Sequence, residues 1–465
     1  MTWWKALRII AIGLGWMGLS ATAAEREGVT ASQQPMETAV SATTLSSPLQ
    51  ACLPIYGEPE FLLRTNESSS HFYEPIATAG DFNGDGLDDV VITKLSFQTT
   101  ETYELEILVN DGNGRLQLAT PNIFQGDLPT VQHPRQIIVA DFNGDHISDI
   151  FVADHGYDLD PFPSYQNALV LSAPNGKLKN ATGNLPQQYD FTHSACVADV
   201  DGDEDIDLYV GNIWGQQQID PQLLLNDGSG HFTVDTNNLP PSLHLDQNLY
   251  TTCEFSDVNQ DQLPDLILGH SGQTIENELS SPNSQILLND GNGTFKLLLN
   301  ALPPQDFEPS DIAHDIQPIH LNDDAYIDLF IVYEKLPGQS YIQALVNNQD
   351  GTFHNETQTR LEPLNRQVWL PRLEAWDFDR DGDQDLLASP FDANDPNPIL
   401  YLNDGSGHFQ RKFVNFKLPY LYYTFLDLGG NDGRDIVYAT YAPPEDIYAI
   451  RDLGCPLFLP YISRR

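Results

Sequence analysis

One Asp-rich loop of nine residues recurs seven times along this chain. Its first copy reads D-F-N-G-D-G-L-D-D over residues 81–89. Aligned on their last Asp, the copies begin at Asp81, Asp141, Asp199, Asp257, His320, Asp377 and Asp427, so successive copies start 50 to 63 residues apart. A repeat of this length predicts one four-stranded propeller blade per copy.

The residues around each loop supply the expected strands. Alternating apolar runs precede the loop, at 136–140 and 195–198, and β-rich runs follow it, at 90–93, 208–210 and 266–268. We interpret these as strands A and B. A second hairpin follows with an Asn-Asp-Gly turn, as at 107–116 and 223–232, and it predicts strands C and D because Asn and Gly tolerate the positive φ of tight turns.

Seven such units predict an all-β, seven-bladed propeller over residues 51–465, closed into one ring because an open array would leave two bare ends. The seventh repeat ends after strand C, near residue 450, and residues 59–65 resemble the missing strand D. Cys52 precedes that segment and Cys455 follows the last strand C. We therefore expect a disulfide between them to lock the closure, worth on the order of 5 kcal/mol on the chain-entropy estimate.

The N-terminal residues lie outside this repeat. Lys5 and Arg8 precede an apolar stretch over 9–19 and small residues at 21–23, which predicts a secretory signal over residues 1–23. Residues 24–50 are rich in Ser, Thr, Ala and Gln and predict a disordered linker. We expect a protein that is secreted, periplasmic or held at the cell surface.

Two further cysteines, Cys196 and Cys253, precede the third and fourth loops on neighbouring inner strands. Export makes a disulfide between these blades plausible. The alternative is two buried free thiols, because their offsets from the loop differ by one residue and strand side chains alternate between faces.

The loops carry the ligands that Ca²⁺ prefers, which are six to eight oxygens from carboxylates, carbonyls and water. In a tight loop, the side chains at positions 1, 3, 5 and 9 can converge on one point, and position 7 offers its carbonyl. The candidate ligands are Asp81, Asn83, Asp85, Leu87 and Asp89; Asp141, Asn143, Asp145, Ile147 and Asp149; Asp199, Asp201, Asp203, Asp205 and Asp207; Asp257, Asn259, Asp261, Leu263 and Asp265; Asn322, Asp324 and Asp328; Asp377, Asp379, Asp381, Asp383 and Asp385; and Asp427, Asn431 and Asp435.

The competing interpretation is a cluster of Asx turns that only caps strand ends. Five complete copies favour metal binding, because carboxylates a few Å apart repel one another unless a cation neutralises them. Mg²⁺ fits less well, since it prefers a stiffer octahedron with several waters. His320 at position 1 and Gly429 at position 3 weaken the fifth and seventh loops, so we expect five to seven Ca²⁺ ions.

The acidic loops followed by Asn-Asp-Gly-x-Gly-x-Phe turns resemble the FG-GAP and VCBS-type repeats, over about residues 52–460. The best-known members are the calcium-binding propeller heads of integrin α subunits. The resemblance implies Ca²⁺ in the A-to-B loops and a partner on the opposite rim. The Phe-Gly and Gly-Ala-Pro elements of integrins are not found, and position 6 is Gly only at Gly86 and Gly382, which places the chain nearer the bacterial VCBS-type repeats.

The rim opposite the acidic loops is the expected binding surface for a protein or a glycan, because its long loops carry polar and aromatic residues. These are His155, Tyr157, Phe162, Tyr165, Trp214 and His270. The alternative is that these rings pack between loops or against strand edges.

The net charge of −44, from 66 acidic and 22 basic residues, disfavours nucleic acid and anionic membranes as partners and makes basic partners easier to accommodate. We expect a monomeric ring without a membrane span that acts as an adhesion or protein-interaction module. A lectin is the alternative, and a polysaccharide lyase or hydrolase is less favoured because no H-E-x-x-H or G-x-S-x-G motif occurs.

Overall fold

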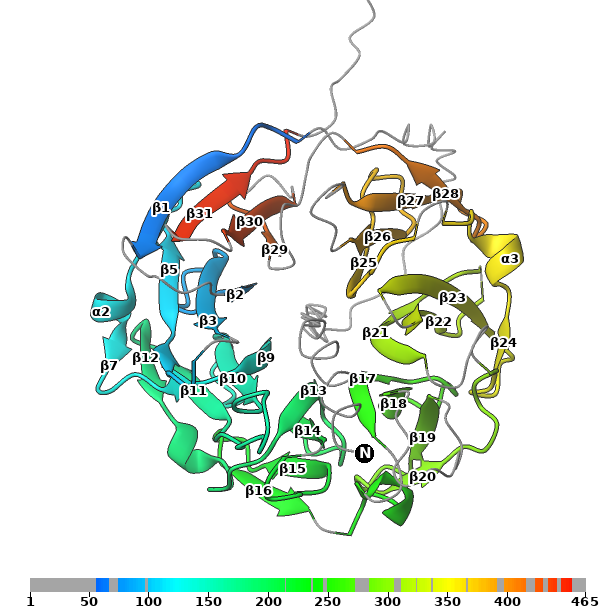
Figure 1. The fold of residues 1–465 in the computed structure, drawn as a ribbon, viewed down its shortest axis with the longest axis horizontal. Helices are drawn as coiled ribbons and strands as arrows, with labels where there is room; N and C mark the ends of the chain where they lie inside the picture. The colour runs from blue at the N-terminus through cyan, green and yellow to red at the C-terminus, as the bar shows by residue number, and fades with distance from the viewer. Residues whose placement is uncertain are drawn as a thin grey trace, which may run out of the picture.

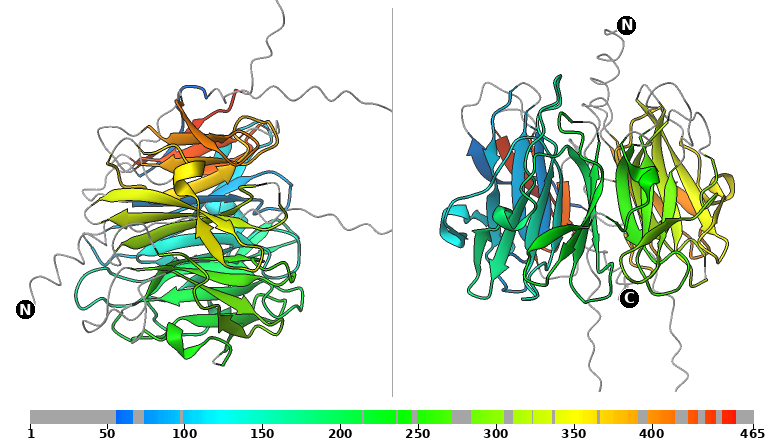
Figure 2. Two further views of the ribbon diagram at one scale, coloured as in Figure 1. Left: turned by 90° about the vertical axis from the view of Figure 1, so that its right-hand side faces the viewer. Right: turned by 90° about the horizontal axis from the view of Figure 1, so that it is seen from below.

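The chain forms a ring of seven β-sheets around a central axis (Figure 1), so the all-β, seven-bladed prediction is confirmed. The computed structural model describes residues 56–66, 74–96, 99–213, 215–235, 237–245, 249–271, 284–304, 311–322, 324–335, 338–364, 367–390, 397–414, 423–429, 434–440 and 445–453. Figure 2 shows the ring from its side as a short cylinder with loops at both faces. The expected signal and linker, residues 1–50, lie outside the described residues.

Each blade places strand A next to the axis and strand D at the outer edge. Blade 1 contains β2 (Glu74–Gly80), β3 (Asp89–Leu95), β5 (Glu106–Asn110) and β6 (Leu116–Leu118). Blade 2 contains β9 (Pro134–Ala140), β10 (Asp149–Asp154), β11 (Ala168–Ala173) and β12 (Lys177–Asn180). Blade 3 contains β13 (Thr192–Ala198), β14 (Asp207–Asn212), β15 (Gln222–Asn226) and β16 (Phe232–Asp235). Blade 4 contains β17 (Tyr250–Ser256), β18 (Asp265–His270), β19 (Gln285–Asn289) and β20 (Phe295–Leu297).

The remaining blades follow the same order. Blade 5 contains β21 (Ile312–Ile319), β22 (Asp328–Lys335), β23 (Gln339–Asn347) and β24 (Phe353–Asn355). Blade 6 contains β25 (Arg372–Trp376), β26 (Asp385–Ser389), β27 (Ile399–Asn403) and β28 (Phe409–Lys412). Blade 7 contains β29 (Tyr423–Leu426), β30 (Asp435–Ala439), β31 (Glu445–Ile450) and β1 (Glu60–Asn66).

Several short strands and helices lie outside the seven four-stranded units. β7 (Phe124–Gln125) adds a fifth strand to blade 2, parallel to β12, and β4 (Tyr103–Glu104) pairs with β8 (Thr130–Val131) between blades 1 and 2. The helices are one or two turns long: α2 (Thr120–Ile123), α3 (Thr357–Arg360), and the 3₁₀ helices η1 (Thr182–Asn184) and η2 (Pro241–Leu243). Among the residues with described structure, no helix is long and apolar enough to cross a membrane.

The first and last strands of the ring pair with each other in blade 7. β1 pairs antiparallel with β31, so the outermost strand of the last blade comes from the N-terminal end of the ring. Arg64 on β1 makes two hydrogen bonds with the Asp446 carboxylate of β31, at 2.6 and 3.1 Å. Cys52 and Cys455, the expected closing disulfide, lie outside the described residues.

Apolar side chains from neighbouring blades form the core. One buried cluster, for example, combines Ile138 and Leu169 of blade 2 with Leu208 and Leu224 of blade 3. Equivalent clusters lie between the other pairs of adjacent blades. Each blade therefore buries its faces only against its neighbours, as a closed ring requires.

Cys196 of β13 and Cys253 of β17 form a disulfide between blades 3 and 4, with their Cα atoms 6.0 Å apart. The two cysteines differ by one residue in their distance from the following acidic loop, which was the argument against this bond. The arrangement of the blades explains why this difference is required. Blade 3 presents one face to blade 4, and blade 4 presents its opposite face to blade 3. Side chains that meet across the junction must therefore have opposite parity along their strands.

Candidate metal centres in the acidic loops

Every acidic loop joins strand A of a blade to strand B of the same blade, so all of them lie at one face of the ring, here called the acidic face. Loops 1 to 7 start at Asp81, Asp141, Asp199, Asp257, His320, Asp377 and Asp427. Positions 1 to 9 are counted from these residues. The opposite face carries the B-to-C connections.

Position 1 shapes the loop by accepting hydrogen bonds from the loop backbone. In loop 1, Asp81 Oδ1 accepts from the N–H groups of Gly84 at 2.7 Å and Asp85 at 3.1 Å, and Oδ2 accepts from Gly86 at 2.7 Å. Asn83 Oδ1 and Asp85 Oδ1 accept from the N–H groups two residues further on, at 2.9 and 3.0 Å. These are Asx turns, so the turn interpretation is part of the geometry and is compatible with a metal site.

Related bonds occur in loops 2, 3, 4 and 6, where Asp141, Asp199, Asp257 and Asp377 accept from backbone N–H groups at positions 4 to 6. The chain turns tightly at position 6, with positive φ at Gly86, His146, Glu204, Gln262 and Gly382. The local fold therefore directs several carboxylates of each loop toward its interior.

The carboxylate at position 9 is buried and joins the loop to strand C. Asp89 is fully buried; its Oδ2 accepts from Phe82 N–H at 3.2 Å, and its Oδ1 accepts from Asn110 N–H at 2.9 Å. Equivalent pairs of bonds are made by Asp149, Asp207, Asp265, Asp328 and Asp385. Position 9 therefore has a structural role that is independent of any ion.

Burial raises the pKa of the position 9 carboxyl to about 7 in loops 1, 2, 3, 4 and 6, at Asp89, Asp149, Asp207, Asp265 and Asp385. Neighbouring aspartates of the same loop raise the pKa further. A cation in the loop would remove this electrostatic cost and keep the carboxylate ionised at neutral pH.

Loops 3 and 6, in which positions 1, 3, 5 and 9 are all carboxylates, bring three acidic oxygens together. The carboxylate oxygens of Asp199, Asp201 and Asp207 lie within 4.8 Å of one another, as do those of Asp377, Asp379 and Asp385. Asp201 Oδ1 and Asp379 Oδ1 are buried atoms without a hydrogen-bond partner. Burial and the neighbouring Asp381 and Asp377 raise the pKa of Asp379 to about 6. A buried oxygen of this kind is what a hard cation would satisfy.

In loops 2 and 4, position 3 is an asparagine, which donates a hydrogen bond to a carboxylate of the same loop, unlike the aspartates at position 3 of loops 3 and 6. Asn143 Nδ2 donates to Asp149 Oδ1 at 3.1 Å, and Asn259 Nδ2 donates to Asp261 Oδ2 at 2.9 Å. The amide N–H thus stabilises one carboxylate of each loop by a hydrogen bond, while the negative charge of the loop is unchanged. For a cation to bind here, the side-chain oxygen of the asparagine would have to coordinate it together with the carboxylates, because the amide nitrogen cannot.

Loops 5 and 7 depart from the pattern, as their sequences predict. His320 is exposed and its Nδ1 lies 3.3 Å from Tyr326 O, while Asp427 N–H donates to Asp88 of blade 1 at 3.0 Å. Asn431 lies outside the described residues. Burial raises the pKa of Asp328 and Asp435, but Arg360 and Arg451 respectively act to lower it.

A family model described as an FG-GAP-like repeat matches residues 81–152, 141–210 and 320–388, and each matched segment contains two consecutive acidic loops. This chain contains FG-GAP-like repeats. No curated protein matches it. Among solved structures, the chain is similar to the Dos1 propeller (12% identity, 85% of this chain, 96% of that chain, TM-score 0.39). It is also similar to the V. cholerae biofilm matrix protein Bap1 (11% identity, 85% of this chain, 91% of that chain, TM-score 0.35).

The sequence did not predict how the blades of the ring are joined to one another at the acidic face. The asparagine that ends strand C donates from Nδ2 to the position 2 carbonyl of the preceding blade's loop. Asn226 bonds Phe142 O, Asn289 bonds Val200 O and Asn347 bonds Val258 O, each at 2.8 Å. Asn226 and Asn289 are the first residues of Asn-Asp-Gly turns and Asn347 begins the corresponding turn Asn-Asn-Gln-Asp-Gly, so a role in the turn already explained these residues from sequence alone.

On the opposite face, the expected binding aromatics are mostly packed. His155 and His270 are buried, and His155 stacks on Phe191 with ring centres 4.2 Å apart. Phe162 lies edge-on to Phe191, whereas Tyr165 lies edge-on to the exposed Tyr189. Trp214 lies outside the described residues. For His155 and His270 the packing alternative therefore holds.

Four neighbouring inner strands carry a β-bulge near their start. Arg135, His193, Thr251 and His314 are the extra residues in β9, β13, β17 and β21. All four residues are buried, and they belong to the strands that line the axis in Figure 1. Bulges re-aim side chains, and here they gather polar groups at the opposite-face end of the axis.

His155 lies in this polar cluster, and its hydrogen-bond partners determine which ring nitrogen carries the proton. Its Nδ1–H donates to Gly156 O at 2.7 Å, and its Nε2 accepts from Arg135 Nε, which can only donate. Arg135 is also paired with Asp158 at 2.8 Å. Burial, together with Arg135, holds the pKa values of His133, His155 and His193 well below 6.5.

We expect the variant His155→Gln to be less sensitive to acid than the wild type. Below pH 6.5 the unfolded histidine takes up a proton that the folded one excludes, so its stabilising contribution is lost as pH falls. The difference amounts to at most about 1.4 kcal/mol per pH unit for one histidine. Asp154 and Asp158, whose pKa values are raised by burial, act in the opposite direction in both proteins and cancel from the comparison. Urea unfolding between pH 7 and 5 measures how steeply the free energy of unfolding changes with pH in the wild type and in His155→Gln. The variant His408→Gln, at an exposed histidine, is the control. Equal slopes for all three proteins would contradict the prediction.

Proposed function

We propose that this FG-GAP ring is an exported, calcium-stabilised module that works by binding a partner, in adhesion or protein interaction. The observation that carries the calcium assignment is the buried, unpartnered Asp379 Oδ1, which lies in a trio of converging carboxylates in loop 6; Asp201 Oδ1 repeats the arrangement in loop 3. Positions 1, 3, 5 and 9 would hold the ion, with the carbonyl of position 7. Calcium would supply the positive charge that balances the negative charge of the buried carboxylates.

Calcium titration tests this assignment. We expect isothermal titration of the mature, calcium-depleted protein to show several ions bound per chain, and the variant Asp201→Asn/Asp379→Asn to bind fewer ions or to bind them more weakly. Asp350→Asn/Asp404→Asn is the matched control, because these exposed aspartates lie in the C-to-D turns of blades 5 and 6 outside the loops. No bound calcium in the wild type would refute the proposal.

Export is supported by the disulfide between Cys196 and Cys253, since disulfides persist in oxidising compartments. The signal predicted over residues 1–23 agrees with this placement. Mass spectrometry of the protein recovered from culture medium, periplasm and cell surface measures both the cleavage point and the compartment.

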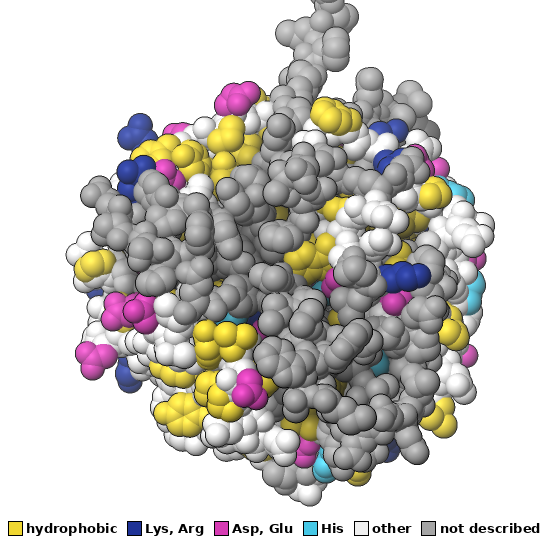
Figure 3. All heavy atoms as spheres, in the orientation of Figure 1, with side chains coloured by type: hydrophobic (Ala, Val, Ile, Leu, Met, Phe, Trp, Pro, Cys, Tyr) yellow, Lys and Arg dark blue, Asp and Glu magenta, His cyan; other side chains and the backbone are white. Residues whose placement is uncertain are grey.

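The opposite face is the proposed partner surface, because its B-to-C loops are long. Figure 3 draws one face of the ring, on which the visible Asp and Glu side chains are sparse and hydrophobic side chains form separate groups. A glycan is the second candidate, favoured by the exposed Tyr189 beside the linked amides of Gln188 and Gln222. Oligosaccharide binding that is lost in Tyr189→Ala would favour the glycan over a protein partner.

A further inference from the structure

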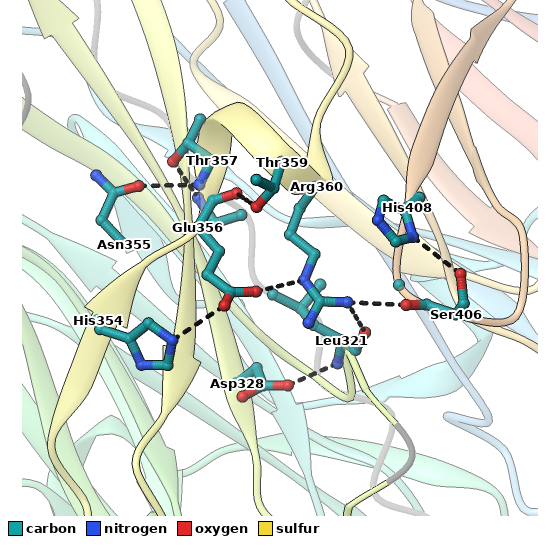
Figure 4. Close-up of polar contacts among 12 residues, drawn as sticks. Leu321, Asp328, His354, Asn355, Glu356, Thr357, Thr359, Arg360, Ser406 and His408 are labelled. Carbon is teal, nitrogen blue, oxygen red and sulfur yellow. Dashed lines mark hydrogen bonds and ion pairs between the residues drawn. The ribbon is translucent and has the colours of Figure 1, made fainter.

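Arg360 lies at the junction beside the incomplete loop 5 (Figure 4). Its Nη1 donates to Leu321 O at position 2 of the loop, at 3.2 Å, and to Ser406 O in the C-to-D turn of blade 6, at 2.8 Å. Its Nε is held by Glu356 at 2.7 Å. The N–H of Leu321 in turn donates to Asp328 Oδ2 at 2.8 Å, so the backbone of a single residue, Leu321, separates the guanidinium from the buried position 9 carboxylate.

Arg451 lies at the corresponding junction beside the incomplete loop 7. Its Nη1 is 3.5 Å from Asp435 Oδ2, the position 9 carboxylate, and its Nη2 donates to Gly114 O in the C-to-D turn of blade 1. Its Nε is 3.6 Å from Glu60 of β1. Like Arg360, it connects its own loop to the same turn of the next blade.

At complete loop 6, Arg380 pairs with Asp452 of blade 7 at 2.9 Å, so its charge is balanced by that carboxylate. Complete loops 2, 3 and 4 instead receive an asparagine amide from the next blade, at Asn226, Asn289 and Asn347. That contact is neutral and leaves the loop with its full negative charge. An arginine makes a similar bridge but also brings a permanent positive charge, because guanidinium stays protonated in proteins. The two arginines occur where position 1 or position 3 lacks an oxygen ligand.

We propose that Arg360 and Arg451 replace the cation at loops 5 and 7, so that the ring takes up five ions, in loops 1, 2, 3, 4 and 6. This inference rests on the proposed calcium function. It follows that the junctions between blades 5 and 6 and between blades 7 and 1, which include the closing strand β1, are held without metal. Loss of calcium loosens the other loops while the closure of the ring is kept.

Ion counting and unfolding of arginine variants test the proposal. We expect five calcium ions per wild-type chain, and a melting temperature that falls in Arg360→Gln and Arg451→Gln by a similar amount with calcium and with chelator. Arg411→Gln is the matched control: Arg411 pairs with Glu362 at 3.0 Å, away from the loops, and its side chain is 25% exposed against 24% for Arg451. Six or seven ions, or arginine variants that behave as Arg411→Gln does, would overturn the inference. No ions in the wild type would instead refute the calcium function.

A restored loop 5 provides a second test that does not depend on loss of stability. His320→Asp completes the ligand set at positions 1, 3, 5 and 9. We expect this single variant to bind five ions and His320→Asp/Arg360→Gln to bind six. A sixth ion in the single variant would show that Arg360 does not exclude the cation.

Discussion

Chelation of calcium is expected to lower the melting temperature of the mature protein by tens of degrees. An ion that binds only the folded chain stabilises it by about 2.7 kcal/mol per site at a hundredfold excess over Kd. Five independent sites would contribute about 13 kcal/mol, which is comparable to the entire stability of a typical domain. Without calcium, the aspartates within each loop repel one another, and the position 9 carboxylate does so in a buried, poorly solvated environment.

Calorimetric or circular dichroism melts with excess calcium and with chelator measure this effect, together with the metal content of the same samples. Magnesium in place of calcium is the control, because Mg²⁺ prefers a smaller octahedral shell and should restore only part of the lost stability. An unchanged melting temperature in a sample free of bound metal would mean that the acidic loops are held by their Asx turns alone.

The repeat pattern predicted the blades well because local signals and tertiary packing agree. The segments 136–140 and 195–198 fall within β9 and β13, and 208–210 and 266–268 fall within β14 and β18. Alternating side chains, Asn-Asp-Gly turns and a fixed spacing all specify the same four-stranded unit. The pairing of β1 with β31 joins residues nearly 400 positions apart, and it was indicated by the missing last strand of the seventh repeat and by the resemblance of residues 59–65 to a strand D.

The features that sequence alone could not settle involve two blades at once. The parity of Cys196 and Cys253 depends on which sheet faces meet, and a single strand's alternation does not contain that information. The amides of Asn226, Asn289 and Asn347 reach a neighbouring blade, but their turn role already explained them. His155 was expected on the binding rim because its loop is long, yet it is buried against Phe191. Arg360 and Arg451 lie more than 20 residues beyond the start of their loops, so the loop motif gave no indication of them.

Substitutions at two aspartates of loop 6 are expected to depend differently on calcium: the effect of one should change sign, and the other should destabilise the protein with or without calcium. Asp379 at position 3 is buried, with a pKa raised to about 6 and one oxygen unpartnered. In the absence of calcium at pH 7.5, the folded state must keep this carboxylate ionised against its surroundings, so Asp379→Asn should raise the melting temperature. In excess calcium the same variant loses a ligand and should melt below the wild type.

Asp385 at position 9 is expected to behave as a structural residue in both conditions. Its carboxylate accepts from the N–H groups of Phe378 and Asn403, at 2.8 and 2.9 Å. Asp385→Ala leaves both buried donors without a partner, which costs about 1–3 kcal/mol for each. The variant should therefore melt well below the wild type with chelator as well as with calcium.

Melts of wild type, Asp379→Asn and Asp385→Ala, each with calcium and with chelator, separate the two roles. The exposed Asp404→Asn, in the C-to-D turn of the same blade, controls for a general change of surface charge. If Asp379→Asn destabilises the chelated protein as much as the calcium-loaded one, its carboxylate is needed by the fold itself and not by an ion. If Asp385→Ala destabilises only the calcium-loaded protein, the two backbone hydrogen bonds contribute little, and metal coordination is the main role of position 9.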